Sequence, residues 1–134
     1  MVNVRLHTEI VIETEDRVGV VAEVSRLLGD MGISIVSIVV RTSDDSATLH
    51  LLTSSQSHAY DALRGAGFSV EEREVILMEI PHHPGYLCRM SEALARKEVA
   101  IQELYATVSD DSPTGVIVIR CANNSSAVLL LRGR

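Results

Sequence analysis

Two short loops carry the residues that are best suited to bind a small charged molecule. The first contains Asp16-Arg17-Val18-Gly19 and the second contains His82-His83-Pro84-Gly85, and an amphipathic helical pattern follows each of them. The first turn of a helix presents unpaired backbone N–H groups, which bind carboxylates. Because glycine has no Cβ, a ligand can approach the backbone closely at that point. The loops therefore predict a binding site for a carboxylate, with either Asp16 or the carbonyl groups of the following strand entry as acceptors for an ammonium group.

The same loops mark a sequence repeat. Gly19 and Gly85 are 66 residues apart, and so are Ile35 and Ile101 at the start of the next predicted strand. A repeat of this length can hold two helices and a small sheet. We therefore predict two domains, residues 1–73 and 74–134, and we look for function in what the repeats share and at the junction between them.

Hydrophobic periodicity predicts the order βαββαβ in the first repeat. The predicted elements are a strand over 8–14, a helix over 20–31, a hairpin of strands over 33–40 and 47–53, a helix capped by Ser55 or Ser57, and a short strand over 68–70 with 73 as its outer limit. The first helix is expected to bury one apolar stripe. This stripe consists of Val20, Val21, Val24, Leu27, Leu28 and Met31.

The strand over 33–40 is apolar on both faces. Strict alternation places Ile33, Ile35 and Val39 on one face and Val36, Ile38 and Val40 on the other. Antiparallel sheets with one solvated face normally alternate between apolar and polar residues. We therefore expect the face away from the helices to pack on another sheet, from the second repeat or from another chain. The alternative is a sheet whose central strands are simply rich in apolar residues.

The second repeat has the same order of elements but stops early. Its predicted elements are a strand over 75–80, a helix over 86–94, strands over 99–107 and 115–121, and a helix capped within 124–126. The last strand, which in this topology lies at an edge beside the first strand, is missing. Another chain, the N-terminal segment or a continuation of the chain would then pair with Val75–Ile80. The charged run Glu71–Glu74 is interpreted as a solvated join between the repeats.

Tandem βαββαβ units with a polar, glycine-ended loop before a helix and a Gly-Ile-x-Ile strand entry resemble ACT domains. The matching strand entries are Ile33-Ser34-Ile35 and Val99-Ala100-Ile101, and the resemblance covers nearly the whole chain. It implies an α+β fold of two ferredoxin-like units with antiparallel sheets, the second without its last strand. ACT domains are known for binding amino acids and related small molecules, usually at interfaces between ACT units, and for regulating enzymes of amino-acid metabolism.

The resemblance also implies the position of the site, because ACT pockets use the first loop and the start of the second strand. The implied ligand-binding residues are Asp16, Arg17, Val18, Gly19, Val20, Ser34 and Ile35, and His82, His83, Pro84, Gly85, Tyr86, Ala100 and Ile101. Many ACT units carry asparagine where this chain has Ser34 and Ala100, and often where it has Asp16 and His82. The two predicted pockets are therefore chemically unequal.

Several of these residues also have simpler structural explanations. Asp16 is as well suited to cap the helix or close an Asx turn as to contact a ligand. Arg17 fits a solvated surface charge, and Pro84 sets φ at a helix start. Adjacent histidines such as His82 and His83 rarely bind one ion together, and no cysteine or carboxylate spacing completes a tetrahedral site. We therefore predict no metal and no cofactor.

Composition argues against several other classes of protein. A net charge of −6 with one Phe and no Trp does not suit nucleic-acid binding, which needs basic surface and stacking platforms. No apolar stretch is long enough to span a bilayer, and the charged residues near the N-terminus predict no signal peptide. The two cysteines lack the spacing of a disulfide framework, which favours a reduced, cytoplasmic setting.

Three functions remain in competition. We predict a non-catalytic regulatory protein, a homodimer formed through sheet faces or edges, that binds a free amino acid at an ACT–ACT interface. The second hypothesis is a docking module whose apolar strand faces bind another polypeptide without a small ligand. The third is an acylphosphatase-like enzyme in which Arg17 holds phosphate. Such enzymes position water with an asparagine on the second strand, whereas the only asparagines are Asn3, Asn123 and Asn124.

Overall fold

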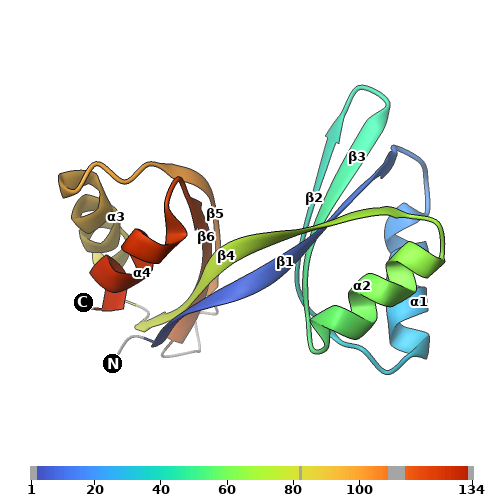
Figure 1. Ribbon diagram of the computed structural model, residues 1–134, viewed down its shortest axis with the longest axis horizontal. Coiled ribbons are helices and arrows are strands. Elements are labelled where there is room, and N and C mark those ends of the chain that lie inside the picture. Colours follow the sequence, from blue (N-terminus) through green and yellow to red (C-terminus); the bar gives the residue numbers. More distant parts are fainter. Residues whose placement is uncertain (1–2, 82, 109–113, 133–134) are drawn as a thin grey trace. The chain divides into compact units, whose positions relative to one another are not determined.

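The structure, a computed structural model, describes residues 3–81, 83–108 and 114–132, and the contacts within it divide the chain into two units. The first unit contains residues 8–73. The second unit contains residues 74–132 together with residues 3–7 from the start of the chain. In each unit, two helices cover one face of an antiparallel sheet (Figure 1).

The first unit has the predicted order βαββαβ. Its elements are β1 (Asn3–Glu15), α1 (Val20–Asp30), β2 (Ile35–Ser43), β3 (Ser46–Thr53), α2 (Gln56–Gly65) and the start of β4 (Ser69–Pro81). β3 pairs with both β1 and β2 in antiparallel fashion, and the strand order is β2-β3-β1-β4. The predicted hairpin and the ferredoxin-like fold are therefore confirmed.

The core of the first unit lies between this sheet and its two helices. Apolar residues from all three layers meet there, namely Ile10, Ile12, Leu49 and Leu51 of the sheet, Val24 and Leu28 of α1, and Ala59 and Leu63 of α2. The predicted stripe of α1 is too wide, because Val21 is 40% exposed and Met31 is 52% exposed. Met31 follows the last helical residue, and Val21 lies in the first turn beside the open loop.

The predicted faces of β2 are wrong. A register shift between Ile35 and Ser37 inserts a β-bulge, after which Ile38 pairs with Leu51 and Val40 with Leu49. Residues that pair across strands share a face, so Ile38 and Val40 lie on the helix-covered face. A bulge adds one residue to one strand and thereby inverts the alternation beyond it.

The opposite face of this sheet carries Val11, His50 and Leu52, which are also buried. These residues alternate along their strands with the core residues Ile10, Leu49 and Leu51. The expectation that another sheet covers this face remains a prediction.

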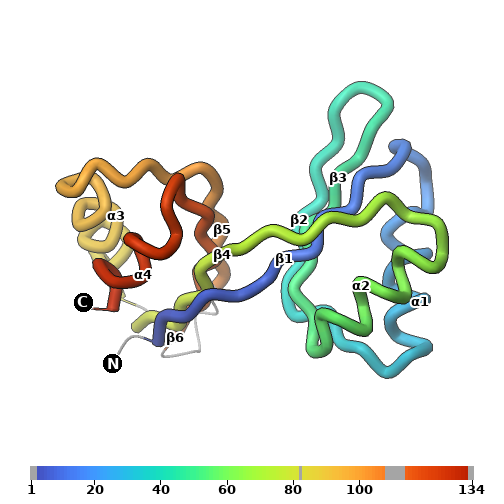
Figure 2. Tube along the Cα trace, in the orientation of Figure 1, coloured from blue at the N-terminus to red at the C-terminus, as the bar shows by residue number. Residues whose placement is uncertain are grey.

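The second unit repeats the fold, and residues 3–7 supply its last strand. Its remaining elements are the end of β4, α3 (Tyr86–Arg96), β5 (Ile101–Val108), β6 (Thr114–Cys121) and α4 (Asn124–Arg132). The strand order is β1-β4-β6-β5, and the N-terminal segment runs beside β4 (Figure 2). Val4 is only 5% exposed and belongs to the core of this unit. Arg132 Nε of α4 donates a hydrogen bond to Val4 O at 3.1 Å.

The sequence left three possible partners open for Val75–Ile80. Of these, the structure places the N-terminal segment beside this strand. Residues 3–7 belong to the second unit in the structure, whereas the predicted domain boundary assigns them to the first. The run Glu71–Glu74 contains the boundary between the two units and belongs to β4, which runs without interruption from Ser69 to Pro81. Its three glutamates are nevertheless exposed, as the charged run predicted.

In both units, one amide side chain at the start of the second helix binds the backbone of the third strand and of the first strand. We call this pair of hydrogen bonds the clasp. Gln56 Oε1 accepts from Thr53 N at 2.8 Å and its Nε2 donates to Thr8 O. In the second unit, Asn124 Oδ1 accepts from Cys121 N and its Nδ2 donates to Glu74 O, both at 2.8 Å. The cap of α4 is Asn123, whose Oδ1 accepts from Ser126 N at 3.0 Å, rather than a residue within 124–126.

The first helix of each unit also ends in the same way. Ile33 N donates to Leu28 O at 2.9 Å, and Val99 N donates to Leu94 O at 3.0 Å. The residue before the donor has positive φ in both units: 72° at Gly32 and 56° at Glu98. The second unit therefore places a glutamate in a left-handed conformation that favours glycine.

Candidate functional site

The first predicted loop connects β1 to α1 and is fixed at both ends. Asp16 N donates to Asp45 O, in the turn between β2 and β3, at 2.8 Å. Val20 is buried and anchors the first turn of α1. Gly19 has φ of 90°, a left-handed conformation that other residues rarely adopt. The sequence motif therefore corresponds to a defined bend at the helix start.

The bend at Gly19 is open to solvent. A Cβ placed on Gly19 would meet no atom within 4 Å, and Asp16, Arg17 and Val18 are exposed. No side chain in the described part of the chain caps α1, so Asp16 does not play the capping role considered above. Arg17 Nη2 forms an ion pair with Glu23 Oε2 at 2.6 Å. Val20 N donates to Arg17 O at 3.4 Å, whereas the next first-turn amides of α1 receive no side-chain cap from the described residues and suit a ligand.

The second predicted loop has the same backbone bend but different side-chain contacts. Gly85 has φ of 88°, and a Cβ on it would also meet no atom within 4 Å. His83 Nδ1 donates to Pro84 O at 3.2 Å, which leaves Nε2 to accept from Arg89 Nη2 at 3.4 Å. His82 lies outside the described residues.

Tyr86 packs between these groups at the start of α3. Its ring lies edge-on to His83, with 5.7 Å between ring centroids, and Arg89 Cζ lies 5.6 Å from the Tyr86 centroid. Burial raises the pKa of Tyr86, and the charge of Arg89 partly offsets this increase. The Tyr86 hydroxyl has no hydrogen-bond partner among the described residues. The second loop therefore forms a small aromatic and cationic cluster.

The strand entries, which complete the predicted site, lie at the other end of each helix. Ser34 N donates to Ser54 Oγ at 2.9 Å, and Ile35 packs against the core of the first unit. In the second unit, Ala100 and Ile101 are exposed. α1 and α3 each contain 11 residues, which corresponds to about 16 Å. The structure therefore does not bring loop and strand entry together within one unit.

A family model gives the same interpretation from sequence alone. The model for the ACT domain matches residues 8–59, which span β1 through the start of α2 and include the first loop and the Ser34 strand entry. This chain contains an ACT domain. The second unit repeats the order of elements of the first, so the chain has an α+β fold of two ferredoxin-like units.

Solved structures show the same fold over almost the whole chain. Protein BT0572 from Bacteroides thetaiotaomicron is 23% identical, with a TM-score of 0.90 over 97% of this chain and 89% of that one. The ligand-free regulatory subunit of aspartate kinase from Thermus thermophilus is 16% identical, with a TM-score of 0.67 over 97% and 95% of the two chains. The corresponding subunit from Thermus flavus is 17% identical, with a TM-score of 0.62 over 98% and 95%. No curated protein matches this sequence.

The ACT domain points to a ligand-binding regulatory module rather than to a catalytic one.

Within the described part of the chain, no helix is long and apolar enough to cross a membrane. Cys88 is exposed, whereas Cys121 is buried in the core of the second unit. A hydrogen bond to Glu92 raises the pKa of Cys88, which disfavours a nucleophilic thiolate.

Two helix residues that face the predicted loops have no signal in the sequence motifs. Glu23 and Arg89 occupy equivalent positions in the repeats, as do Arg17 and His83. Each loop side chain contacts its helix partner six residues later. The spacing of the repeat contains this information, because a shift of 66 residues aligns both pairs. The first ACT loop therefore carries a neutralised cation, whereas the second carries a cation without a carboxylate partner among the described residues.

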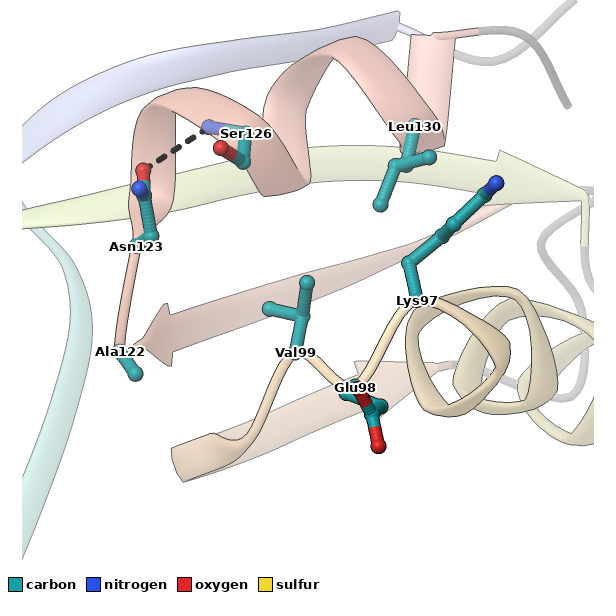
Figure 3. A pocket seen from close by; sticks show the side chains of 7 residues that line it. All are labelled: Lys97, Glu98, Val99, Ala122, Asn123, Ser126 and Leu130. Carbon is teal, nitrogen blue, oxygen red and sulfur yellow. Dashed lines mark hydrogen bonds between the residues drawn. The ribbon is translucent and has the colours of Figure 1, made fainter.

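Two of the cavities in the structure have no counterpart among the sequence motifs. One of about 400 Å³ lies beside the first ACT loop and is lined by Glu13, Thr14, Glu15, Arg17, Glu23, Ala66, Gly67, Phe68 and Ser69. Another of about 430 Å³ lies in the second unit, between the start of α4 and the turn before β5 (Figure 3). Both depend on side chains from several elements, which periodicity does not place together.

A buried polar pair in the first ACT unit was also missed. His50 Nδ1 lies 2.8 Å from Glu9 Oε1, and both side chains are almost completely buried. His50 alternates along β3 with the core residues Leu49 and Leu51. That alternation was the available signal, since it directs His50 to the face opposite the helices.

Proposed function

We propose that this chain is a regulatory ACT protein that binds a free amino acid at an interface between ACT units. The observation that carries the proposal is the cavity of about 400 Å³ beside the first loop, with Arg17 in its wall. This volume is within the range of small-molecule sites. The cavity also lies beside a helix start whose amides are not capped by a side chain in the described chain.

The chemistry of this cavity matches a zwitterion. The Arg17 guanidinium and the first-turn amides of α1 suit a carboxylate. The carboxylates of Glu13 and Glu15 line the same cavity and suit an ammonium group. Phe68 supplies an apolar wall for the remainder of the ligand. An incoming carboxylate would compete with Glu23 for Arg17, and this exchange is favourable only if the ammonium is bound as well.

The second loop is proposed as the weaker of the two amino-acid sites. Pro81 stands where the first repeat has Glu15, and Arg89 stands where it has Glu23. His83 and Arg89 suit an anionic group, but these replacements remove two acceptors for an ammonium. The strand entries Ser34-Ile35 and Ala100-Ile101 are proposed to contact ligands held by a loop of another ACT unit. This geometry follows from their place at the far end of each helix.

We further propose that the chain is a cytoplasmic homodimer formed through sheet edges. β2 is the end strand of its sheet and exposes the apolar side chains of Val36, Ile38 and Val40. An unpaired apolar edge strand favours association. A ligand that orders such an interface stabilises the association by linkage, which supplies a regulatory output. Docking of another protein to this edge, without a ligand, is the second candidate function.

A thermal-shift screen of the full chain against the standard amino acids tests the proposal. We expect a saturable rise in Tm with one or two of them. Arg17→Gln should abolish the rise, whereas the matched variant Arg89→Gln in the second loop should retain most of it. A rise that survives Arg17→Gln but is lost with Arg89→Gln would overturn the choice of loop. No response at millimolar concentration of any amino acid would favour the docking function.

A further inference from the structure

The cavity in the second unit lies away from the two predicted loops. It is formed by the turn between α3 and β5, the turn between β6 and α4, and α4 itself (Figure 3). Its lining residues are Lys97, Glu98, Val99, Ala122, Asn123, Ser126 and Leu130. Its volume of about 430 Å³ is sufficient for a small organic molecule.

A comparison of the repeats reveals an unused hydrogen-bond donor next to Ala122, which is one of the lining residues. Ser54 N donates to Ser34 O at 2.9 Å, and the equivalent Ala122 N donates to Ala100 O at 3.0 Å. In the first unit, the return bond runs from Ser34 N to the Ser54 hydroxyl. Ala122 has no hydroxyl, so this bond cannot form in the second unit. No acceptor for Ala100 N–H is found among the described residues.

The other polar groups around the cavity are mainly donors. Asn123 Oδ1 is occupied by Ser126 N–H, which leaves the Asn123 amide N–H₂ as a donor. Lys97 extends along Leu130, whereas the Glu98 carboxylate points away from both (Figure 3). A site with several donors and one cation selects an anion with more than one acceptor oxygen.

The apolar residues of the lining determine which group the anion must carry besides its charge. Val99 and Leu130 both project into the space between α4 and the turn before β5 (Figure 3). Burial of a short aliphatic chain against them removes apolar surface from water and favours binding. A doubly charged or fully polar anion would leave this apolar surface without a partner. The arrangement therefore matches an amphipathic monocarboxylate.

We propose that the second unit binds a carboxylate with a short branched aliphatic tail in this cavity. The carboxylate accepts from Ala100 N–H, the tail packs on Val99 and Leu130, and Lys97 supplies positive charge in the wall of the cavity. The first unit lacks the equivalent site because Ser54 already occupies the donor of Ser34. This site is independent of the amino-acid site proposed at the first loop.

Amide NMR titration of the full chain with 4-methylpentanoate tests this assignment. We expect saturable shifts at Val99, Ala100 and Asn123 and no shift at the loop residues Gly19 and Val20. The uncharged analogue 4-methylpentanamide should bind at least about tenfold more weakly, because it loses a charge-assisted hydrogen bond. Leucine has the same tail and an added ammonium, which the positive charge of Lys97 repels, so it should also bind more weakly. Equal binding of the amide, or tighter binding of leucine, would overturn the proposal.

Two matched variants provide the decisive comparison. Ala122→Ser supplies the hydroxyl that the first unit uses, so it should occupy Ala100 N–H and weaken 4-methylpentanoate binding about tenfold. Ser54→Ala makes the reciprocal change in the first unit and should leave this binding unchanged. Lys97→Gln changes an exposed residue and should also weaken binding without affecting the fold. Unchanged affinity in both Ala122→Ser and Lys97→Gln, or no saturable shift in the natural chain, would refute the site.

Discussion

The two ACT-type units share a framework but differ in the chemistry placed on it. Gln56 and Asn124 make equivalent clasps, and the first helix of each unit ends with an equivalent hydrogen bond. At the loops, however, the same two positions hold Arg17 with Glu23 in one unit and His83 with Arg89 in the other. Backbone geometry is therefore retained where it builds the fold, while the charges that select a ligand differ.

The units also differ in how they obtain their last strand. The first unit uses residues that directly follow α2, whereas the second uses residues 3–7 from the far end of the chain. Bringing residues of such large sequence separation together has a high cost in loop-closure entropy. The second unit should therefore depend on residues 3–7, which the first unit does not need.

Disruption of this strand should have the largest effect. Val4→Asp places a carboxylate in the core of the second unit and should cost about 3 kcal/mol or more in its free energy of unfolding. Arg5→Asp introduces the same side chain at an exposed position of the same strand and should cost less than about 0.5 kcal/mol. Urea denaturation followed by amide exchange in β6 and β3 would measure both. Equal loss of protection in β6 and β3 would contradict the expectation that only the second unit depends on residues 3–7.

Removal of the clasps should have the next largest effect and should be similar in the two units. Asn124→Ala leaves Cys121 N–H and Glu74 O without their side-chain partner, and Gln56→Ala does the same for Thr53 N–H and Thr8 O. Each change should lower the free energy of unfolding by about 2 kcal/mol. Asn123→Ala, which removes only a helix cap, should cost about 1 kcal/mol. A negligible effect of either clasp variant in chemical denaturation would show that the clasps are not equivalent.

The turns after α1 and α3 should respond to substitution with opposite sign. Glu98→Gly relieves a left-handed glutamate and should stabilise by about 1 kcal/mol, whereas Gly32→Ala should destabilise by about the same amount. A Cβ on Gly32 would meet no atom within 4 Å, so the expected cost is conformational rather than steric. Thermal unfolding of both variants would test this, and a change of the same sign in both would refute it.

The smallest effect is expected at the ion pair of the first loop. Arg17 and Glu23 have side chains that are 44% and 48% exposed, and pairs of this kind contribute about 0–1 kcal/mol. Arg17→Gln should therefore change the free energy of unfolding by less than about 0.5 kcal/mol at moderate salt. Stability measured at low and high ionic strength provides the check. A loss of several kcal/mol would assign Arg17 a structural role in place of a binding role.

Sequence reasoning recovered the features that local patterns encode. The repeat, the order βαββαβ and the loop glycines follow from spacing and periodicity over short windows. The faces of β2 could not be obtained in this way, because the bulge between Ile35 and Ser37 leaves no mark in the alternation. The partner of Val75–Ile80 stayed open because strand pairing depends on residues far apart in the chain.

The candidate sites were only partly predictable for the same reason. Gly19 and Gly85 were identified because a loop glycine before a helix is a local signal. The cavity lined by Lys97, Ala122 and Leu130 combines three separate elements. Its distinguishing feature, the replacement of Ser54 by Ala122, becomes meaningful only when the hydrogen bond of Ser34 is known.

Amide NMR of the full chain with each standard amino acid tests the central claim most directly. The account predicts that one or two amino acids produce saturable shifts at Arg17, Gly19 and Glu23 at millimolar concentration or below. The amides of His83 and Arg89 should shift less with the same ligand. Shifts confined to the second loop, or none at either loop, would contradict the account.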